Sequence, residues 1–354
     1  MKMMSFHLPK QANALARPNV NEAQRYRTLL QIAVVLTVIA LVLPALSNAY
    51  WIKIFTSVFI CAIAASGVGL LYRQLGLVCL SQYALMGVGG WISLRIYHAW
   101  GWPFEACVLA GAVGGSMMGM VGGLPALRLR GLYLALTTLM MAGAFQVFIG
   151  AINFPDGGEG LSGRAMDGAR LMMSRPFLAE TDSAFLRYVL VWLAFALCLI
   201  ELHRYSRVGR SWALIRKGDT SALSAGVNII FYQTWAFGLA GFLAGCAGGL
   251  LAGAIGSLDG RAFTASESIL MFALSIVGGV YNWFGVIIAG LLLRAVPASL
   301  SDLGVSGYVA MMFFGVALLH ALITAPTGIA GQLADLLSRV PAFIRRLIER
   351  KQHD

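Results

Sequence analysis

Charged side chains are scarce in this sequence. Asp, Glu, Lys and Arg make up 12% of its 354 residues and hydrophobic residues make up 59%, whereas a typical soluble domain carries about 25% charged residues. The mean hydropathy is +0.78. So few polar groups cannot cover the surface of a soluble fold of this length, so lipid must solvate much of the chain. We therefore expect an all-α integral membrane protein.

The sequence also lacks the residue patterns that catalysis and metal binding require. Its cysteines each lie in an apolar run, without a Cys-x-x-Cys pair or a histidine at ligand spacing, and read as small buried hydrophobes. They are Cys61, Cys79, Cys107, Cys198 and Cys246. There is no Gly-x-x-x-x-Gly-Lys-Ser/Thr motif for ATP hydrolysis, and no Ser–His–Asp set. We expect no enzymatic activity, no metal and no cofactor in this chain.

Ten apolar stretches approach the ~20 residues that a helix needs to cross the hydrocarbon core. They cover residues 28–48, 52–71, 76–96, 104–127, 132–152, 185–202, 231–255, 267–281, 283–300 and 307–325. The short pair 267–281 and 283–300 forms either two tilted spans or a re-entrant hairpin, so the expected count is ten, with eight as the alternative. The first stretch and its polar leader are both too long for a signal peptide, so we expect a retained first helix.

The distribution of charge predicts the orientation. With both termini in the cytoplasm, the inner segments hold 18 of the 26 Lys and Arg residues but 6 of the 15 acids, leaving 8 basic and 9 acidic groups outside. This is a strong positive-inside pattern, and it explains the net charge of +11 without nucleic-acid binding. The predicted organisation is a cytoplasmic arm (1–27), a transmembrane domain (28–325) with an external loop (153–184) and a cytoplasmic loop (203–230), and a basic cytoplasmic tail (326–354).

Acidic residues are missing from the centres of the predicted helices, which disfavours an ion-coupled carrier or a channel. Lys53 and Arg95 lie at span ends, where they can reach the interface. Arg294 lies deeper, and a cation near the bilayer centre costs about 2.5–3.5 kcal/mol on insertion scales. In an antiparallel hairpin, Glu267 would lie about one helical turn from Arg294. A structural ion pair is the preferred interpretation, and a solute or gating contact is the alternative.

Two predicted helices carry glycine at every fourth position. The two series are Gly111, Gly115, Gly119 and Gly123, and Gly241, Gly245, Gly249 and Gly253. A four-residue step keeps the glycines on one helix face, where they form a groove that lets a neighbouring backbone approach closely. Tight packing is the preferred interpretation, and sliding of these faces during a transport cycle is the alternative.

The cytoplasmic loop 203–230 is the longest polar segment inside the predicted domain. Asp219 or Thr220 is suited to cap a short helix that ends at Gly226. Trp212, with Leu214 and Ile215, gives this loop an apolar edge beside basic residues. The pattern alone fits two structures equally well, a helix docked into the groove of another protein or an interfacial helix on anionic lipid.

The chain resembles the permease subunits of high-affinity branched-chain amino-acid ABC importers, over roughly residues 55–335. Five segments carry the resemblance in the family's order. They are the cytoplasmic turn at 123–139, the glycine loop at 157–163, the segments 209–216 and 225–228 of loop 203–230, the late-helix residues Ser268 to Leu270 with Gly278, Gly279 and Gly285, and Pro326 to Gly328.

The resemblance implies partners and a role. The chain would be one of two transmembrane subunits, paired with a related permease and two cytoplasmic ATPases, and would receive solute from an external binding protein at the cell inner membrane. It also favours the docking interpretation of loop 203–230. The implied ATPase-coupling residues are Gly209, Arg210, Trp212, Arg216, Asp219, Ala225, Gly226 and Asn228. The implied residues along the solute path are Ser81, Gln82, Tyr83, Gly87, Gly278 and Gly279.

This sequence departs from the family at three positions. Gln82 and Tyr83 stand where a Gly-His pair is usual, Ser221 replaces a common acidic residue, and Gln233 follows Tyr232 where a lysine is common. The first departure falls on a helix expected to line the solute path, so a permease for urea or short amides remains the alternative to an amino-acid permease.

Overall fold

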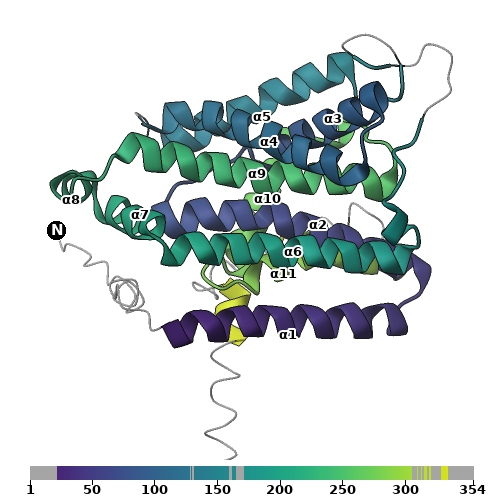
Figure 1. The fold of residues 1–354 in the computed structure, drawn as a ribbon, viewed down its shortest axis with the longest axis horizontal. Coiled ribbons are helices and arrows are strands. Elements are labelled where there is room, and N and C mark those ends of the chain that lie inside the picture. Colours follow the sequence, from purple (N-terminus) through teal and green to yellow (C-terminus); the bar gives the residue numbers. More distant parts are fainter. Residues whose placement is uncertain are drawn as a thin grey trace, which may run out of the picture.

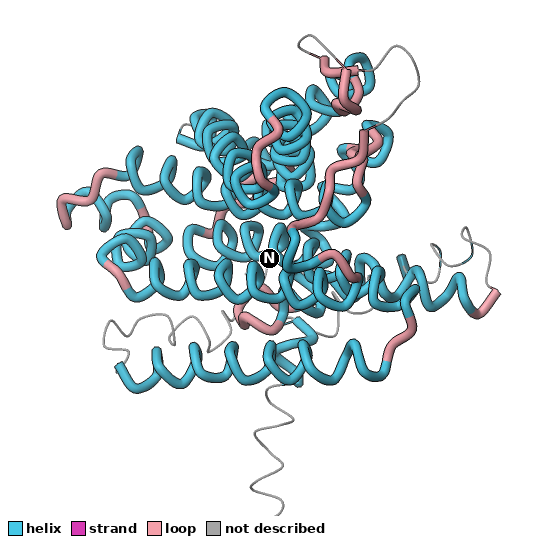
Figure 2. The backbone as a smooth tube through the Cα atoms, turned by 45° about the vertical axis from the view of Figure 1, so that its right-hand side comes forward, coloured by secondary structure: helices cyan, strands magenta, loops and turns pink. Residues whose placement is uncertain are grey.

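The computed structural model describes residues 22–127, 129, 131–158, 162–164, 171–304, 309, 312, 315–316, 319 and 328–333. The expected N-terminal arm, most of the stretch 307–325 and most of the C-terminal tail lie outside these residues. The described part is helical and contains no strand, as Figure 2 shows. The predicted all-α class is confirmed.

Six long helices are joined to shorter ones in a bundle whose axes run roughly parallel or antiparallel (Figure 1). The long helices are α1 (Glu22–Leu46), α2 (Ala49–Leu70), α4 (Phe104–Gly123), α5 (Leu132–Ile152), α6 (Asp182–Tyr205) and α9 (Ile229–Ile255). The others are α3 (Gln82–Trp100), α7 (Arg207–Lys217), α8 (Asp219–Ser224), α10 (Ala265–Gly278), α11 (Gly285–Gly290) and α12 (Val296–Asp302). Seven helical segments of the described part are long and apolar enough to cross a membrane, which supports a multi-pass membrane protein. The count of ten stays a prediction.

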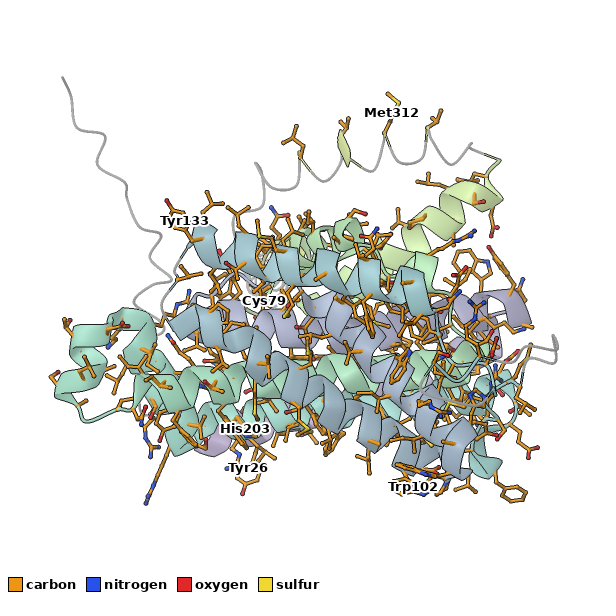
Figure 3. The ribbon with its side chains drawn as sticks, turned by 90° about the horizontal axis from the view of Figure 1, so that it is seen from above. Tyr26, Cys79, Trp102, Tyr133, His203 and Met312 are labelled. Carbon is orange, nitrogen blue, oxygen red and sulfur yellow. The ribbon has the colours of Figure 1, made fainter. Side chains whose placement is uncertain are left out.

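The two ends of the bundle differ. One end carries α7 and α8, with Tyr133 and His203 in the same half of the molecule, and we call it the α7–α8 end (Figures 1 and 3). The opposite end, with Trp102, carries the connections between α5 and α6 and between α9 and α10, and we call it the loop end. Aromatic residues at both ends of an apolar bundle suit the two interfaces of a bilayer.

The two glycine series pack against each other. An added Cβ on Gly115 would lie 2.5 Å from the carbonyl oxygen of Gly241, and one on Gly119 would lie 2.6 Å from that of Phe237. Glycine is therefore required where the backbones of α4 and α9 meet. Gly245 lies between Gly89 of α3 and Gly111 of α4, so α9 is the central helix of a three-helix core.

The helix α3 begins inside the bundle rather than at its end. A five-residue π-helical turn (Leu71–Leu75) extends α2, and residues 76–81 are then non-helical. The Nε2 of Gln82 donates a 2.8 Å hydrogen bond to the carbonyl of Ala240, which lies well within α9. The amide of Leu80 donates to Thr138 Oγ1 at 3.0 Å. Irregular backbone at membrane depth is tolerated because it is enclosed by other helices.

The segments after α9 run to the α7–α8 end and back. Helix α10 starts at the loop end, where Thr264 caps it by accepting from the amide of Glu267. The turn after α10 reaches the α7–α8 end, because the guanidinium carbon of Arg216 lies over the ring of Tyr281, 6.0 Å from the ring centroid. The returning segment Gly285–Asp302 is 18 residues long and contains a second π-helical turn, Leu291–Ala295.

Candidate functional site

The helices α7 and α8 form an elbow that projects from one end of the bundle (Figure 1). Ser206 separates α6 from α7, and its hydroxyl accepts from the amide of Val208 at 3.1 Å. Gly218, with φ of 148°, joins α7 to α8. Gly226 follows α8 with φ of 71°, and Asn228 caps α9 by accepting from the amide of Phe231 at 3.1 Å. The short helix predicted before Gly226 is thus present, but its N-cap is Gly218, so the cap predicted at Asp219 or Thr220 was wrong.

Trp212 fixes this elbow to the rest of the chain. Its side chain is 0% exposed, its Nε1 donates a 2.8 Å hydrogen bond to the carbonyl of Tyr232, and its ring stacks on His203. Ile215 is also buried. Trp212 and Ile215 of the apolar edge noted in the sequence therefore pack inside this chain, whereas Leu214 is half-buried. The buried ring of Trp212 offers no surface to a partner.

Gly209 belongs to the same joint. A Cβ at this position would overlap the main-chain carbonyl of Arg204 in the last turn of α6. A larger residue would have to move α7 away from α6, so glycine sets how closely the elbow folds back on the bundle.

Arg216 links the elbow to two membrane-crossing segments. Its Nη1 donates to the main-chain carbonyl of Arg73 in the π-helical turn that ends α2, and to that of Tyr72 at 3.4 Å. On its other side lies Tyr281, in the turn between α10 and α11. The link to α2 was not expected from the sequence, because Arg73 and Arg216 are far apart along the chain and no local pattern joins them.

The outer surface of the elbow is both basic and apolar. Arg210, Lys217, Ala225 and Asn228 are exposed, and Leu223 is 63% exposed. An exposed large aliphatic residue among basic ones fits the edge of a protein–protein contact. Of the predicted coupling residues, Arg210, Ala225, Gly226 and Asn228 are thus accessible, whereas Gly209 and Trp212 are buried and Arg216 and Asp219 are half-buried.

The residues predicted along the solute path fall in different places. Ser81 and Gln82 are buried between helices, and Gly87 packs against Phe145 and Phe263. Gly278 and Gly279 approach the backbone of Gly285, where α10 and α11 meet. Tyr83 alone of this set lines the large cavity of the described part, at the loop end.

That cavity has a volume of about 680 Å³, within the range of small-molecule sites. Its walls come from the connection after α5, the end of α9 and the connection 256–263, together with Ser57, Tyr83 and Arg294. Neither connection was predicted to line a site. The available signals were the Phe154-Pro155-Asp156 sequence directly after α5 and the polar run from Ser257 to Arg261 after α9.

Arg294 has a different set of partners from those predicted. Its Nη2 donates to the hydroxyl of Tyr83 at 2.7 Å and its Nε to Cys61 Sγ at 3.5 Å. Glu267 is near enough to act on the guanidinium electrostatically, but among the described residues it forms no direct ion pair with Arg294. Its position, three residues after the capping Thr264, suits a carboxylate that stabilises the start of α10.

The described residues contain no group of three or more His, Cys, Asp or Glu side chains placed to hold a metal ion. All five cysteines are free thiols.

Comparisons with known proteins agree with this architecture. A family described as the permease component of the branched-chain amino acid transport system matches residues 50–322. The high-affinity branched-chain amino acid transport system permease protein LivM of Escherichia coli (strain K12) is 26% identical over 279 residues, covering 73% of this chain and 66% of that protein. LivM of Salmonella typhimurium (strain LT2) is 27% identical over 280 residues, covering 73% and 65%.

The chain thus spans just under two thirds of these two relatives. A more distant relative, the D-allose transport system permease protein AlsC of Escherichia coli (strain K12), is 25% identical over 248 residues, covering 69% of this chain and 73% of that protein. No solved structure matches significantly.

Proposed function

The chain belongs to the family of branched-chain amino acid transport system permease components, and on this premise we propose that it is the membrane-spanning subunit of a binding-protein-dependent ABC importer. It moves branched-chain or related aliphatic amino acids by alternating access. The sequence has no P-loop, so the energy comes from ATP hydrolysis in separate subunits.

The assembly we propose has four further components. A second permease, either a related chain or another copy of this one, completes the transmembrane part. Two ATPase subunits bind at the α7–α8 end, and a solute-binding protein binds at the loop end. In this proposal the α7–α8 end and both termini lie in the cytoplasm, the loop end lies outside, and the chain lies in the cell inner membrane. The positive-inside distribution of charge supports this orientation.

The observation that carries the proposal is the attachment of the elbow. Helix α7 continues from α6 through Ser206, bonds to the end of α2 through Arg216 and bonds to the start of α9 through Trp212. A partner that pushes on the exposed face of this elbow therefore moves three crossing helices together. This is the connection that ATP-driven alternating access requires, because ATPase closure must reach the solute path as a rigid displacement.

The experiment is uptake into sealed vesicles that contain the complete transporter. We expect leucine uptake to require ATP on the side of the membrane that the α7–α8 end faces. Uptake should also require the binding protein on the opposite side. Uptake driven by a proton or sodium gradient without ATP would overturn the proposal in favour of an ion-coupled carrier. Uptake of urea or short amides in place of leucine, still driven by ATP, would retain the permease role and change its solute.

A further inference from the structure

The cavity at the loop end contains a deeply placed cation. Arg294 lies near the middle of the 18-residue segment Gly285–Asp302, within the membrane-crossing part of the chain, and its side chain lines the cavity. It sits on the π-helical turn Leu291–Ala295. Such turns are rare in helices and occur frequently at functional sites.

The hydrogen bonds of this guanidinium are incomplete. An arginine has five N–H donors, and the contacts formed by Arg294 in the described part of the chain are those to the neutral hydroxyl of Tyr83 and the thiol of Cys61. A guanidinium held inside a membrane protein is normally paired with a carboxylate. Among the described residues the bonded partners carry no charge, Glu267 acts on the guanidinium without a direct ion pair, and the cation lines a space large enough for a small molecule.

Tyr83 places a hydroxyl beside the cation at a break in the fold. It is in the first turn of α3, directly after the non-helical residues 76–81, and its ring packs against Phe263 with centroids 5.3 Å apart. Interrupted helices form the solute sites of many membrane transporters because their free main-chain groups and side chains converge at mid-membrane depth. The Tyr83–Arg294 pair therefore lies where a bound solute would be enclosed.

The remaining walls separate apolar from charged surface. Leu251, Ile255, Leu258 and Ala262 provide an aliphatic wall, whereas the two connections contribute charge of both signs, from Asp156, Arg164, Asp259 and Arg261. An anionic group fits beside Arg294, an aliphatic chain fits along the apolar wall, and a cationic group is favoured towards the carboxylates of Asp156 and Asp259. These three requirements together describe a zwitterionic aliphatic amino acid.

We infer that the loop-end cavity is a solute site within this chain, in which Arg294, oriented by Tyr83, binds the carboxylate of an aliphatic amino acid. The inference rests on the proposed permease function and adds the chemical group that is recognised. An uncharged solute such as urea or a sugar gains no ionic contact from a guanidinium, so the cavity favours a carboxylate-bearing solute over both.

Direct binding tests this site. The assembled transporter, without its binding protein, is placed in lipid nanodiscs, and binding of L-leucine and of leucinamide, which lacks the carboxylate, is followed by saturation-transfer NMR. We expect leucine to bind about tenfold more tightly than leucinamide, as befits one charge-assisted bidentate contact. Arg294→Gln should abolish this preference. The matched control is Arg187→Gln, an exposed arginine outside the cavity that bonds to the carbonyl of Ala40, and it should keep the preference.

Two further variants cover the event that Arg294→Gln fails to assemble. Arg294→Lys keeps the charge but loses the planar fork, and Tyr83→Phe removes only the hydroxyl, so each should weaken leucine binding severalfold. Equal binding of leucine and leucinamide by the wild type, or unchanged leucine affinity in these variants, would overturn the site.

Uptake measurements separate this inference from the proposed function. ATP-dependent uptake of leucine that is the same in wild type and Arg294→Gln would overturn the site and leave the permease role intact. Leucine binding that depends on Arg294, in an assembly that shows no ATP-dependent uptake, would support the site and overturn the proposed function.

Discussion

Arg216 donates a hydrogen bond from its guanidinium to the main-chain carbonyl of Arg73, joining the elbow helix α7 to the end of α2. The last carbonyls of a helix have no partner within it, and a cation there also interacts favourably with the helix dipole. Arg216 thus satisfies an acceptor that the π-helical turn leaves free, the carbonyl of Arg73. Because the acceptor belongs to the main chain, the contact follows any movement of α2 itself.

Arg216→Ala should uncouple ATP hydrolysis from transport. Loss of the guanidinium removes the hydrogen bond from α7 to α2 while the bond of Trp212 to α9 remains, so partner closure is passed to α2 less effectively than to α9. We expect the amount of leucine transported per ATP hydrolysed to fall by about tenfold. One hydrogen bond to a charged group contributes about 1.5–3 kcal/mol, and its loss accounts for a change of this size. The measurement is uptake and ATPase activity in the same proteoliposomes.

The matched control for this change is Lys217→Ala. Lys217 is the next residue of α7 and is exposed, so its removal takes a positive charge from the elbow without touching α2. It should leave the ratio of transport to hydrolysis within about twofold, because exposed charges contribute little. Equal effects of the two changes would contradict a specific role for the Arg216–Arg73 contact.

Charge reversal on the outer surface of the elbow should weaken ATPase binding. Arg210 is exposed on α7, and Arg210→Glu places a negative charge on a basic surface without altering the core. We expect less ATPase subunit to co-purify, with little remaining uptake, while the protein still inserts in the membrane. Arg27→Glu is the control, because Arg27 is an exposed arginine on α1 rather than on α7 or α8. Normal co-purification and uptake in Arg210→Glu would refute docking at this surface.

Gly226→Pro should uncouple transport by a different route. Gly226 has φ of 71°, which the proline ring cannot adopt because it fixes φ near −65°. The connection from α8 to α9 must then rearrange. We expect the proline variant to insert in the membrane, but ATP hydrolysis by the partner subunits should no longer support uptake. Gly226→Asn should retain most of the uptake, because asparagine tolerates this backbone region better. Full uptake by the proline variant would show that the geometry of this connection is not needed.

The helical architecture and the elbow were predictable because their signals are local. The four-residue glycine spacing defines a helix face, and a helix-ending glycine such as Gly226 acts within one turn. The sequence also singled out Arg294 by its depth, since a cation in an apolar run needs a partner wherever it lies. Each of these inferences depends on residues that are close along the chain.

The partners of these residues were not predictable. Arg294 bonds to Tyr83 because α3 begins inside the bundle, and no periodicity shows that residues 76–81 are non-helical within an apolar stretch. The burial of Trp212 was also not predictable, because an amphipathic helix places such a residue either at a docking surface or in a buried contact. Burial against Tyr232 and His203 depends on how α7 folds back on α6 and α9, which is tertiary information.

Close packing between α4 and α9 predicts an uneven response to alanine. A Cβ at Gly115 would lie 2.5 Å from the carbonyl oxygen of Gly241, so Gly115→Ala must push the helices apart, at a cost of about 1–3 kcal/mol. Gly143 of α5 has no atom within 4 Å of the same position, and Gly143→Ala should be neutral or stabilising by about 0.5–1 kcal/mol. Thermal unfolding of the purified protein measures both. Similar shifts for the two variants would argue against contact between the glycine faces.

Replacement of Trp212 separates its anchoring role from contact with a partner. Its ring is fully buried and its Nε1 bonds to Tyr232, so Trp212→Ala should lower stability by about 3–5 kcal/mol. Trp212→Phe, which keeps most of the ring contacts and loses the hydrogen bond, should lose about 1 kcal/mol from that bond. Trp235→Ala is the control, because Trp235 is 39% exposed and should cost less than Trp212→Ala.

The distinguishing measurement is ATPase co-purification with the Trp212→Phe protein, made at a temperature where it is folded. An anchor that acts inside the chain leaves the outer surface with Arg210 and Leu223 in place, so ATPase binding should equal that of the wild type even though the thermal midpoint falls. A docking residue would show the reverse, with ATPase binding lost and the thermal midpoint unchanged. Because the ring is covered by His203 and the start of α9, we expect the first pattern.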